Sequence, residues 1–124
     1  MNIVVTSHQF LPEFSSGTEL IAYNIAVELQ SRGHAVTVVS AKPCDSDKLP
    51  TPRVDHYEHD GLSVYRFWHA NDIHEGQTHA MESEYNHRGF YRWFRGFLET
   101  RRPDLVHFIH LNRLSGAAID ACTE

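Results

Sequence analysis

The chain has 124 residues, a formal net charge of −5 and two cysteines. This length suits one domain with a core of its own, and the negative charge argues against a general nucleic-acid-binding protein. Cys44 and Cys122 form no metal-binding spacing, and no apolar run is long enough to cross a membrane. Because residue 2 leads directly into a strand pattern without signal-peptide features, we expect a cytoplasmic protein in a reducing compartment.

The start of the chain predicts a strand, a helix and a second strand. Residues 3–7 are rich in β-branched side chains, and residues 17–32 show helical periodicity. Residues 35–40 form a second β-branched run that is too apolar for a half-exposed strand. A right-handed βαβ crossover places such a helix on one face of a parallel sheet, so we expect an α/β fold.

The helix over residues 17–32 has an apolar stripe and well-marked ends. The stripe consists of Ile21, Ile25 and Leu29 at i, i+4 and i+8, with Ala22 and Ala26 beside them. We expect this stripe to pack on the sheet and Glu19 to lie elsewhere. Ser16 and Glu19 fit a capping box, and Gly33 is well placed to end the helix.

The loop over residues 8–15 and the helix start after it lie at the carboxyl end of the first strand, where open α/β sheets bind ligands. The N–H groups at a helix start and the positive end of the helix dipole suit a phosphate or carboxylate. We therefore predict that Ser16, Gly17 and Thr18 bind substrate, the alternative being an ordinary helix start. A dinucleotide site would need GxGxxG here, and the chain has only Gly17.

The rest of the chain continues the alternation of strands and helices. Asp60-Gly61 joins two short strands within residues 53–68 in a strong hairpin pattern. The other predicted elements are loops over residues 42–52 and 69–79, a helix over residues 81–102, a strand over residues 105–110 and the start of a helix at residues 115–122. Because this last helix stops after about two turns with no strand behind it, we expect residues 1–124 to be a single, truncated domain.

The sequence contains ten histidines, which raises the question of a metal site. The pairs His56/His59 and His107/His110 lie on predicted strands at i and i+3, where side chains point to opposite faces, so we predict no metal site. We favour the interpretation of His107 as a hydrogen-bonded core histidine. The alternative is that His107 contacts a ligand. His110, nearer the strand end, is the stronger candidate for contacting substrate.

Residues 88–102 combine five arginines with aromatic side chains. One interpretation is a helix with Phe90, Phe94 and Phe97 in the core and its arginines in water. The other is an amphipathic helix that lies on an anionic membrane or on a partner protein. We favour the first interpretation, because the stretch is short and interrupted by glycine.

The order of these segments resembles the N-terminal half of the retaining glycosyltransferase family 4, which has the GT-B architecture. The resemblance rests on SGTE at the helix start, RGHAVTVVSA through the second strand, DGLSVYRF in the hairpin and PDLVHFIHLNRLSG near the end. Two positions differ from the family pattern. The family loop commonly reads Gly-Gly where this chain has Ser16-Gly17, and the family strand often reads H-x-H where this chain reads HFIH from His107.

The resemblance implies a Rossmann-like, three-layer α/β/α domain with a mostly parallel sheet, which binds the acceptor. It implies transfer of a sugar from a nucleoside-diphosphate sugar to a sugar or lipid-linked acceptor, with retained configuration and without metal or further cofactor. A C-terminal domain would hold the donor, so the chain alone is expected to be inactive. His110, or less favourably His107, would donate a hydrogen bond to a sugar hydroxyl or phosphate oxygen.

Two other function classes remain open. The chain could be a free-standing Rossmann-like module for a phosphorylated small molecule, which predicts useful affinity in isolation. It could instead use residues 88–102 to bind a partner or the inner face of the membrane. Charge-reversing substitutions at Arg92 and Arg95 would then abolish liposome binding.

Overall fold

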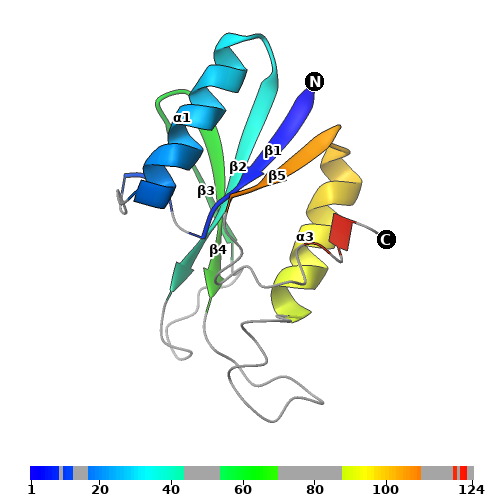
Figure 1. The fold of residues 1–124 in the computed structure, drawn as a ribbon. Helices are drawn as coiled ribbons and strands as arrows, with labels where there is room; N and C mark the ends of the chain where they lie inside the picture. The colour runs from blue at the N-terminus through cyan, green and yellow to red at the C-terminus, as the bar shows by residue number, and fades with distance from the viewer. Residues whose placement is uncertain are drawn as a thin grey trace.

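The computed structural model describes residues 1–8, 10–12, 17–43, 54–69, 88–109, 119 and 121–122, and the structural statements below concern these residues. Figure 1 shows the elements, which are β1 (Asn2–Thr6), α1 (Gly17–Ser31), β2 (Ala35–Pro43), β3 (Val54–His59), β4 (Leu62–His69), α3 (Arg88–Arg101) and β5 (Leu105–Phe108). The predicted strands, hairpin and two long helices are thus present. Residues 81–87 of the second predicted helix, the loop at 70–79 and most of the last predicted helix lie outside the described residues.

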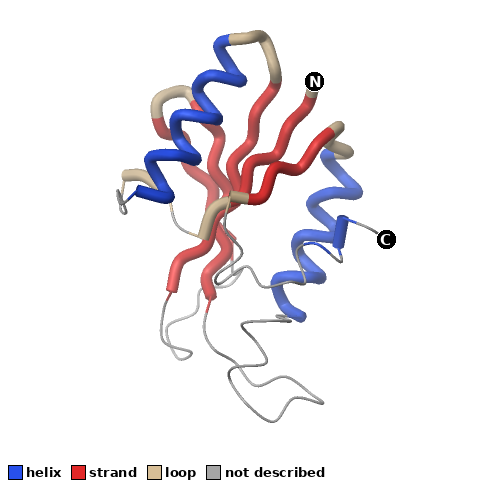
Figure 2. The backbone as a smooth tube through the Cα atoms, viewed as in Figure 1, coloured by secondary structure: helices blue, strands red, loops and turns tan. Residues whose placement is uncertain are grey.

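The described strands form one five-stranded sheet in the order β3-β4-β2-β1-β5. β1 pairs in parallel with β2 and β5, β2 pairs in parallel with β4, and β3 runs antiparallel to β4. Helix α1 lies on one face of the sheet and α3 on the other (Figures 1 and 2). The predicted α/β fold with a mostly parallel sheet and α/β/α layers is therefore confirmed.

The hairpin between β3 and β4 turns at Asp60-Gly61, as predicted. Both residues have positive φ, 50° and 80°, which is the backbone that a type I′ turn requires. The turn is tied to α1, because the Tyr23 hydroxyl donates to the Asp60 carboxylate at 2.7 Å and Gln30 Nε2 donates to the Gly61 carbonyl at 3.2 Å. The hydrogen bond to Asp60 raises the pKa of Tyr23, with further contributions from burial and from the Asp60 charge.

Helix α1 packs on the sheet with its smallest side chains. Ala22 and Ala26 are fully buried together with Glu19, at i, i+3 and i+7, whereas Ile21 is 56% exposed. Leu29 is partly buried against the core. The prediction that Ile21 faces the sheet and Glu19 lies elsewhere is therefore wrong, because the two alanines bring the helix too close to the strands for a branched side chain to fit between them.

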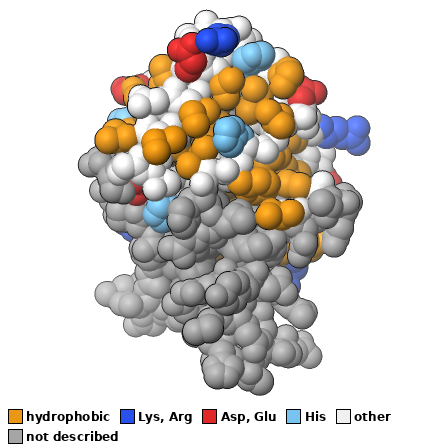
Figure 3. All heavy atoms as spheres, viewed as in Figure 1, with side chains coloured by type: hydrophobic (Ala, Val, Ile, Leu, Met, Phe, Trp, Pro, Cys, Tyr) orange, Lys and Arg blue, Asp and Glu red, His pale blue; other side chains and the backbone are white. Residues whose placement is uncertain are grey.

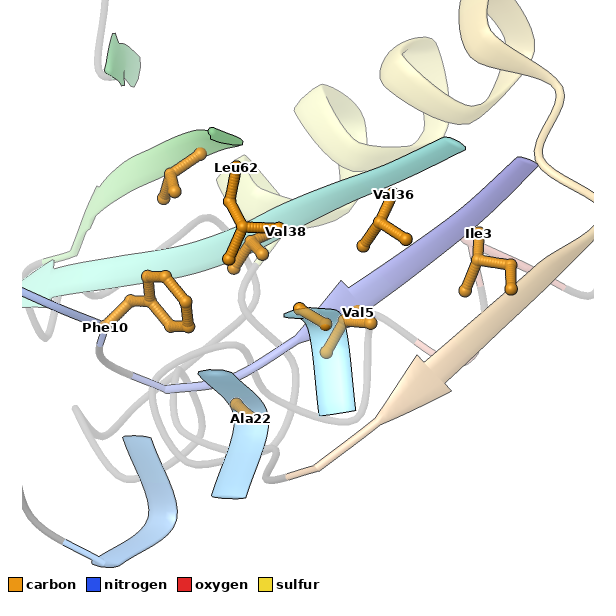
Figure 4. Packing of buried hydrophobic residues seen from close by; sticks show 9 residues of the cluster. Ile3, Val5, Phe10, Ala22, Val36, Val38 and Leu62 are labelled. Carbon is orange, nitrogen blue, oxygen red and sulfur yellow. The ribbon is translucent and has the colours of Figure 1, made fainter. Parts of the chain in front are cut away.

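Two hydrophobic clusters fill the space on either side of the sheet. The α1-side cluster, which Figure 4 shows in part, consists of Ile3, Val5, Phe10, Ala22, Ala26, Val36, Val38, Leu62 and Val64. The α3-side cluster consists of Val4, Val39, Ala41, Phe67, Phe90, Phe94, Phe97 and Ala121. Neighbouring residues of β1 and β2 enter opposite clusters, as expected for strands that are covered on both faces.

Helix α3 packs on the sheet through phenylalanines. Phe90 and Phe94 are fully buried and Phe97 nearly so. The Phe90 ring stacks on Phe94 with centroids 5.1 Å apart and meets Phe67 of β4 edge-on at 5.3 Å. The interpretation of this helix as one with its aromatic side chains in the core is confirmed.

Candidate functional site

The carboxyl ends of β1, β2 and β5 meet at one edge of the sheet, beside the start of α1 (Figure 1). Ser7 N donates to the Val39 carbonyl and Ile109 N donates to the Thr6 carbonyl, each at 3.0 Å, so the strands stay paired up to this edge. The first N–H groups of a helix have no partner within the helix, and they carry the positive end of its dipole. The start of α1 therefore contributes a positive potential to this edge, which favours an anion.

Within the described part of the chain, the hydroxyl groups of Thr6, Ser7 and Ser40 are buried at this edge without a hydrogen-bond partner. Ser7 and Ser40 lie on the α1 side of the sheet, because Val5 and Val38, two residues earlier, belong to the α1-side cluster. Thr6 points to the opposite side. Buried polar groups in proteins nearly always form hydrogen bonds. The two serine hydroxyls can therefore bond a polar group that is brought to this edge.

Glu19, which the sequence predicts to cap the helix and to lie away from the sheet, is buried at this edge. It is fully buried in the first turn of α1, on the helix face that packs on the sheet. Its carboxylate is thus on the same side of the sheet as Ser7 and Ser40, at the same end of α1 where the helix dipole favours negative charge. The spacing of Glu19, Ala22 and Ala26 at i, i+3 and i+7 places the three side chains on one helix face, so the sequence did indicate that Glu19 shares the face of the two alanines.

Residues 10 and 11, in the loop after β1, contact other residues on the α1 side of the sheet. Phe10 is 2% exposed and belongs to the α1-side cluster (Figure 4). The carbonyl of Leu11 accepts a hydrogen bond from the Tyr57 hydroxyl of β3 at 2.6 Å, and the Leu11-Pro12 peptide bond is cis. These contacts hold Phe10 and Leu11 against the core.

Gly17 and Thr18 form the first two positions of α1, where the sequence predicts substrate binding, and Ser16 lies outside the described residues. Gly17 is exposed, and a Cβ added to it would meet no heavy atom within 4 Å. The fold itself therefore does not require glycine here. The backbone at Gly17 is therefore open to approach from outside.

His107 is exposed on β5 and does not lie in the core. It alternates with Val106 and Phe108, which pack into the α3-side cluster, so its side chain is on the α1 side of the sheet. The interpretation of His107 as a hydrogen-bonded core histidine is wrong, because α1 packs on β1 and β2 and leaves β5 uncovered. Leu105 is 46% exposed for the same reason, and Figure 3 shows hydrophobic side chains gathered on this face. His110 lies outside the described residues.

The histidines of β3 lie on opposite faces of the hairpin. His56 Nε2 is 2.6 Å from Ser63 Oγ and its ring stacks on Tyr65, whereas the His59 ring meets Tyr23 of α1. Among the described residues, no group of three or more His, Cys, Asp or Glu side chains could hold a metal ion. None of the described helices has the length and hydropathy needed to cross a membrane.

Comparison with known families shows which family the chain belongs to. A family model described as a glycosyl transferase 4-like domain matches residues 16–122. The chain belongs to this family. No curated protein and no solved structure matches the chain significantly. At the level of the family, the function is therefore that of a glycosyltransferase.

The match to the family model begins at the start of α1 and continues past β5. It includes all of the predicted site positions, which are Ser16, Gly17, Thr18, His107 and His110. It also includes Glu19 and Ser40, whereas Ser7 precedes it. The described site thus combines residues inside the matched region with the end of β1.

Proposed function

We propose that this chain is the acceptor-binding half of a retaining glycosyltransferase with the GT-B architecture. The observation that carries the proposal is the family match over residues 16–122, which begins at the helix start beside the carboxyl edge of the sheet. The reaction transfers a sugar from a nucleoside-diphosphate sugar to a hydroxyl of a sugar or lipid-linked acceptor. A second, C-terminal domain holds the donor nucleotide, and the isolated chain is inactive.

The start of α1 supplies electrostatic stabilisation in this mechanism. The N–H groups of Gly17 and Thr18, with Ser16 before them, bind a phosphate group of the donor or an anionic group of the acceptor. As the bond from the anomeric carbon to the diphosphate oxygen breaks, negative charge grows on that oxygen, and the positive end of the helix stabilises it. Ser7 and Ser40 hydrogen-bond polar groups that the substrates bring to the same edge.

The transfer step exchanges the bond at the anomeric carbon and moves one proton. The acceptor hydroxyl oxygen bonds to the anomeric carbon, the nucleoside diphosphate leaves, and the acceptor proton passes to the leaving phosphate oxygen. His110 donates a hydrogen bond to a sugar hydroxyl or phosphate oxygen near the reacting centre, and His107, exposed on β5, is the second candidate. The step uses no metal ion and no further cofactor, and we place the enzyme in the cytoplasm.

A free-standing module that binds a phosphorylated small molecule is the second candidate function. It is favoured by the fact that the helix start, the open space beside Gly17 and the buried serine hydroxyls all belong to this chain. The membrane-binding alternative has less support. Phe90 and Phe94, which would have to enter the lipid, are fully buried against the sheet.

The test is to read the natural frame past codon 124 and to assay its product with a panel of nucleotide sugars. We expect transfer by the full product and none by residues 1–124. His110→Ala and Gly17→Trp should each lower the rate by about ten-fold or more, since one removes a hydrogen bond and the other fills the ligand space. Gly17→Ala, which adds only a Cβ in open space, and His34→Ala, at the opposite end of the sheet, should retain activity.

A natural frame that ends near codon 124 would contradict the half-enzyme. If that short product bound a phosphorylated sugar and Gly17→Trp abolished the binding, the second candidate would replace it. A full product that transfers sugar but tolerates Gly17→Trp would place the reaction away from the start of α1.

A further inference from the structure

Helix α3 and the β3–β4 hairpin border an open, shallow groove of about 530 Å³ on the opposite side of the sheet from α1. Its lining includes Val54, Tyr65, Arg92, Trp93, Phe97 and Arg101. Small-molecule sites typically have volumes of about 300–1,000 Å³, so the groove is large enough for a ligand of a few rings. None of these residues takes part in the candidate site at the carboxyl edge.

The floor of the groove is aromatic. Phe97 meets Tyr65 edge-on and Trp93 at a tilt, with ring centroids 5.2 Å apart in each pair. Tyr65 and Trp93 are only partly buried, so parts of both rings are accessible from the groove. The apolar C–H face of a sugar ring stacks on such rings through dispersion and weak C–H contacts. A row of adjoining rings suits a ligand with more than one sugar.

Two guanidinium groups border this aromatic floor. Arg101 lies over Tyr65 and Phe97, with its Cζ atom 4.9 Å and 5.4 Å from the ring centroids, and it donates to the Tyr65 hydroxyl. Arg92 is exposed one turn before Gly96 on the same helix. A guanidinium held in place on aromatic rings presents a planar set of donors that matches a carboxylate.

These two arginines differ from others in the described part of the chain. Arg66 pairs with Asp55 at 2.7 Å and Arg95 pairs with Glu99 at 3.1 Å. Among the described residues, no carboxylate pairs with Arg92 or Arg101. The chain as a whole carries a net charge of −5. Arg92 and Arg101 nevertheless form a local positive site beside the aromatic floor, which favours an anionic ligand.

We propose that this groove binds an acidic oligosaccharide, with sugar rings stacked on Trp93 and carboxylates held by Arg92 and Arg101. The inference stands apart from the transfer reaction, because the groove lies on the face opposite α1 and reaches none of the residues assigned to the reacting centre. In a glycosyltransferase it holds acceptor sugars that are remote from the reacting end, whose binding energy can support the reaction.

A membrane surface fits the groove less well. Tyr65 and Trp93 are partly buried against the α3-side cluster, and Phe90, Phe94 and Phe97 are buried in it. Insertion into lipid requires apolar side chains that project from the protein surface. Anionic vesicles therefore serve as a second probe in the test.

Tryptophan fluorescence provides a direct assay, because the chain has two tryptophans and only Trp93 lines the groove. In a Trp68→Phe background, Trp93 is the sole tryptophan. We expect trigalacturonate to change its emission saturably at low salt, and neutral maltotriose to have no effect at the same concentration. Arg92→Gln should weaken binding about ten-fold, because one charge-assisted contact is lost. Arg32→Gln, which removes an exposed charge just after the end of α1, should leave it unchanged.

Three results would overturn the proposal. The first is no saturable change with trigalacturonate at about 10 mM, or an equal change with maltotriose. The second is equal weakening by Arg92→Gln and Arg32→Gln, once circular dichroism shows that both variants are folded. The third is a response to phosphatidylglycerol vesicles alone, which would assign the groove to a membrane surface. The sugar-transfer assay is a separate measurement, so failure of either proposal leaves the other standing.

Discussion

The packing of α1 can be tested with two substitutions at neighbouring positions. Ile21 is 56% exposed, and full burial of an isoleucine contributes about 1.5–3 kcal/mol. We therefore expect Ile21→Ala to lower the free energy of unfolding by no more than about 1 kcal/mol, since the better helix propensity of alanine offsets part of the loss. Ala22 is fully buried against the sheet, so Ala22→Leu should cost about 1–3 kcal/mol through overpacking.

Urea denaturation followed by circular dichroism measures both changes in the free energy of unfolding. The slope of this free energy against urea concentration should stay unchanged if the folded and unfolded states keep their compactness. Ile21→Leu, which conserves volume, is the matched control and should cost less than Ile21→Ala. A larger loss for Ile21→Ala than for Ala22→Leu would refute the reasoning. It would show that the isoleucine stripe and not the alanine face packs on β1 and β2.

The same assay tests three further features. Phe94→Ala removes a fully buried ring and should cost about 3–5 kcal/mol, whereas a small loss would place the ring outside the core. Ser7→Ala and Ser40→Ala remove unpartnered buried hydroxyls, so each should leave the free energy of unfolding unchanged or raise it; a clear loss would reveal a bond within the fold. Because Asp60 raises the pKa of Tyr23, their contact stabilises the fold below the usual tyrosine pKa of about 10 and is lost as pH rises through the raised value. Tyr23→Phe should remove this part of the alkaline loss, and an unchanged pH profile would contradict the assignment.

Local sequence signals were sufficient to predict the elements themselves. The turn at Asp60-Gly61 has the positive φ angles that its residues suggest. Helix α1 ends as predicted, because Gly33 has φ of 92° and its N–H donates to the Gln30 carbonyl at 3.0 Å. In both places the backbone conformation depends on the residue at that position and its immediate neighbours.

Local sequence signals did not predict which face of each helix or strand is buried. A hydrophobicity pattern gives isoleucine more weight than alanine, yet the close approach of α1 to the sheet favours Ala22 and Ala26 over Ile21. The sequence placed His107 on a predicted strand over residues 105–110 and suggested a core histidine. In the structure β5 lies beside β1, beyond the reach of α1, and His107 is exposed.

The candidate site was visible from the sequence only in part. The helix start at Gly17 follows from a glycine and a capping pattern next to a strand end, and these are neighbours along the chain. Ser7, Glu19 and Ser40 are far apart in sequence and share a site only because β1 and β2 pair in parallel and α1 packs over them.

The sequence by itself determined where the described strands, helices and turns lie and that they form an α/β domain, since short-range backbone preferences and periodicity set these features. The glycosyltransferase type came instead from the resemblance to a family, which the match over residues 16–122 supports. Tertiary structure alone decided which helix face is buried, which strand face stays uncovered and which hydroxyls meet at the carboxyl edge. These depend on strand order and on the distance between helix and sheet, which arise from the packing of the whole domain.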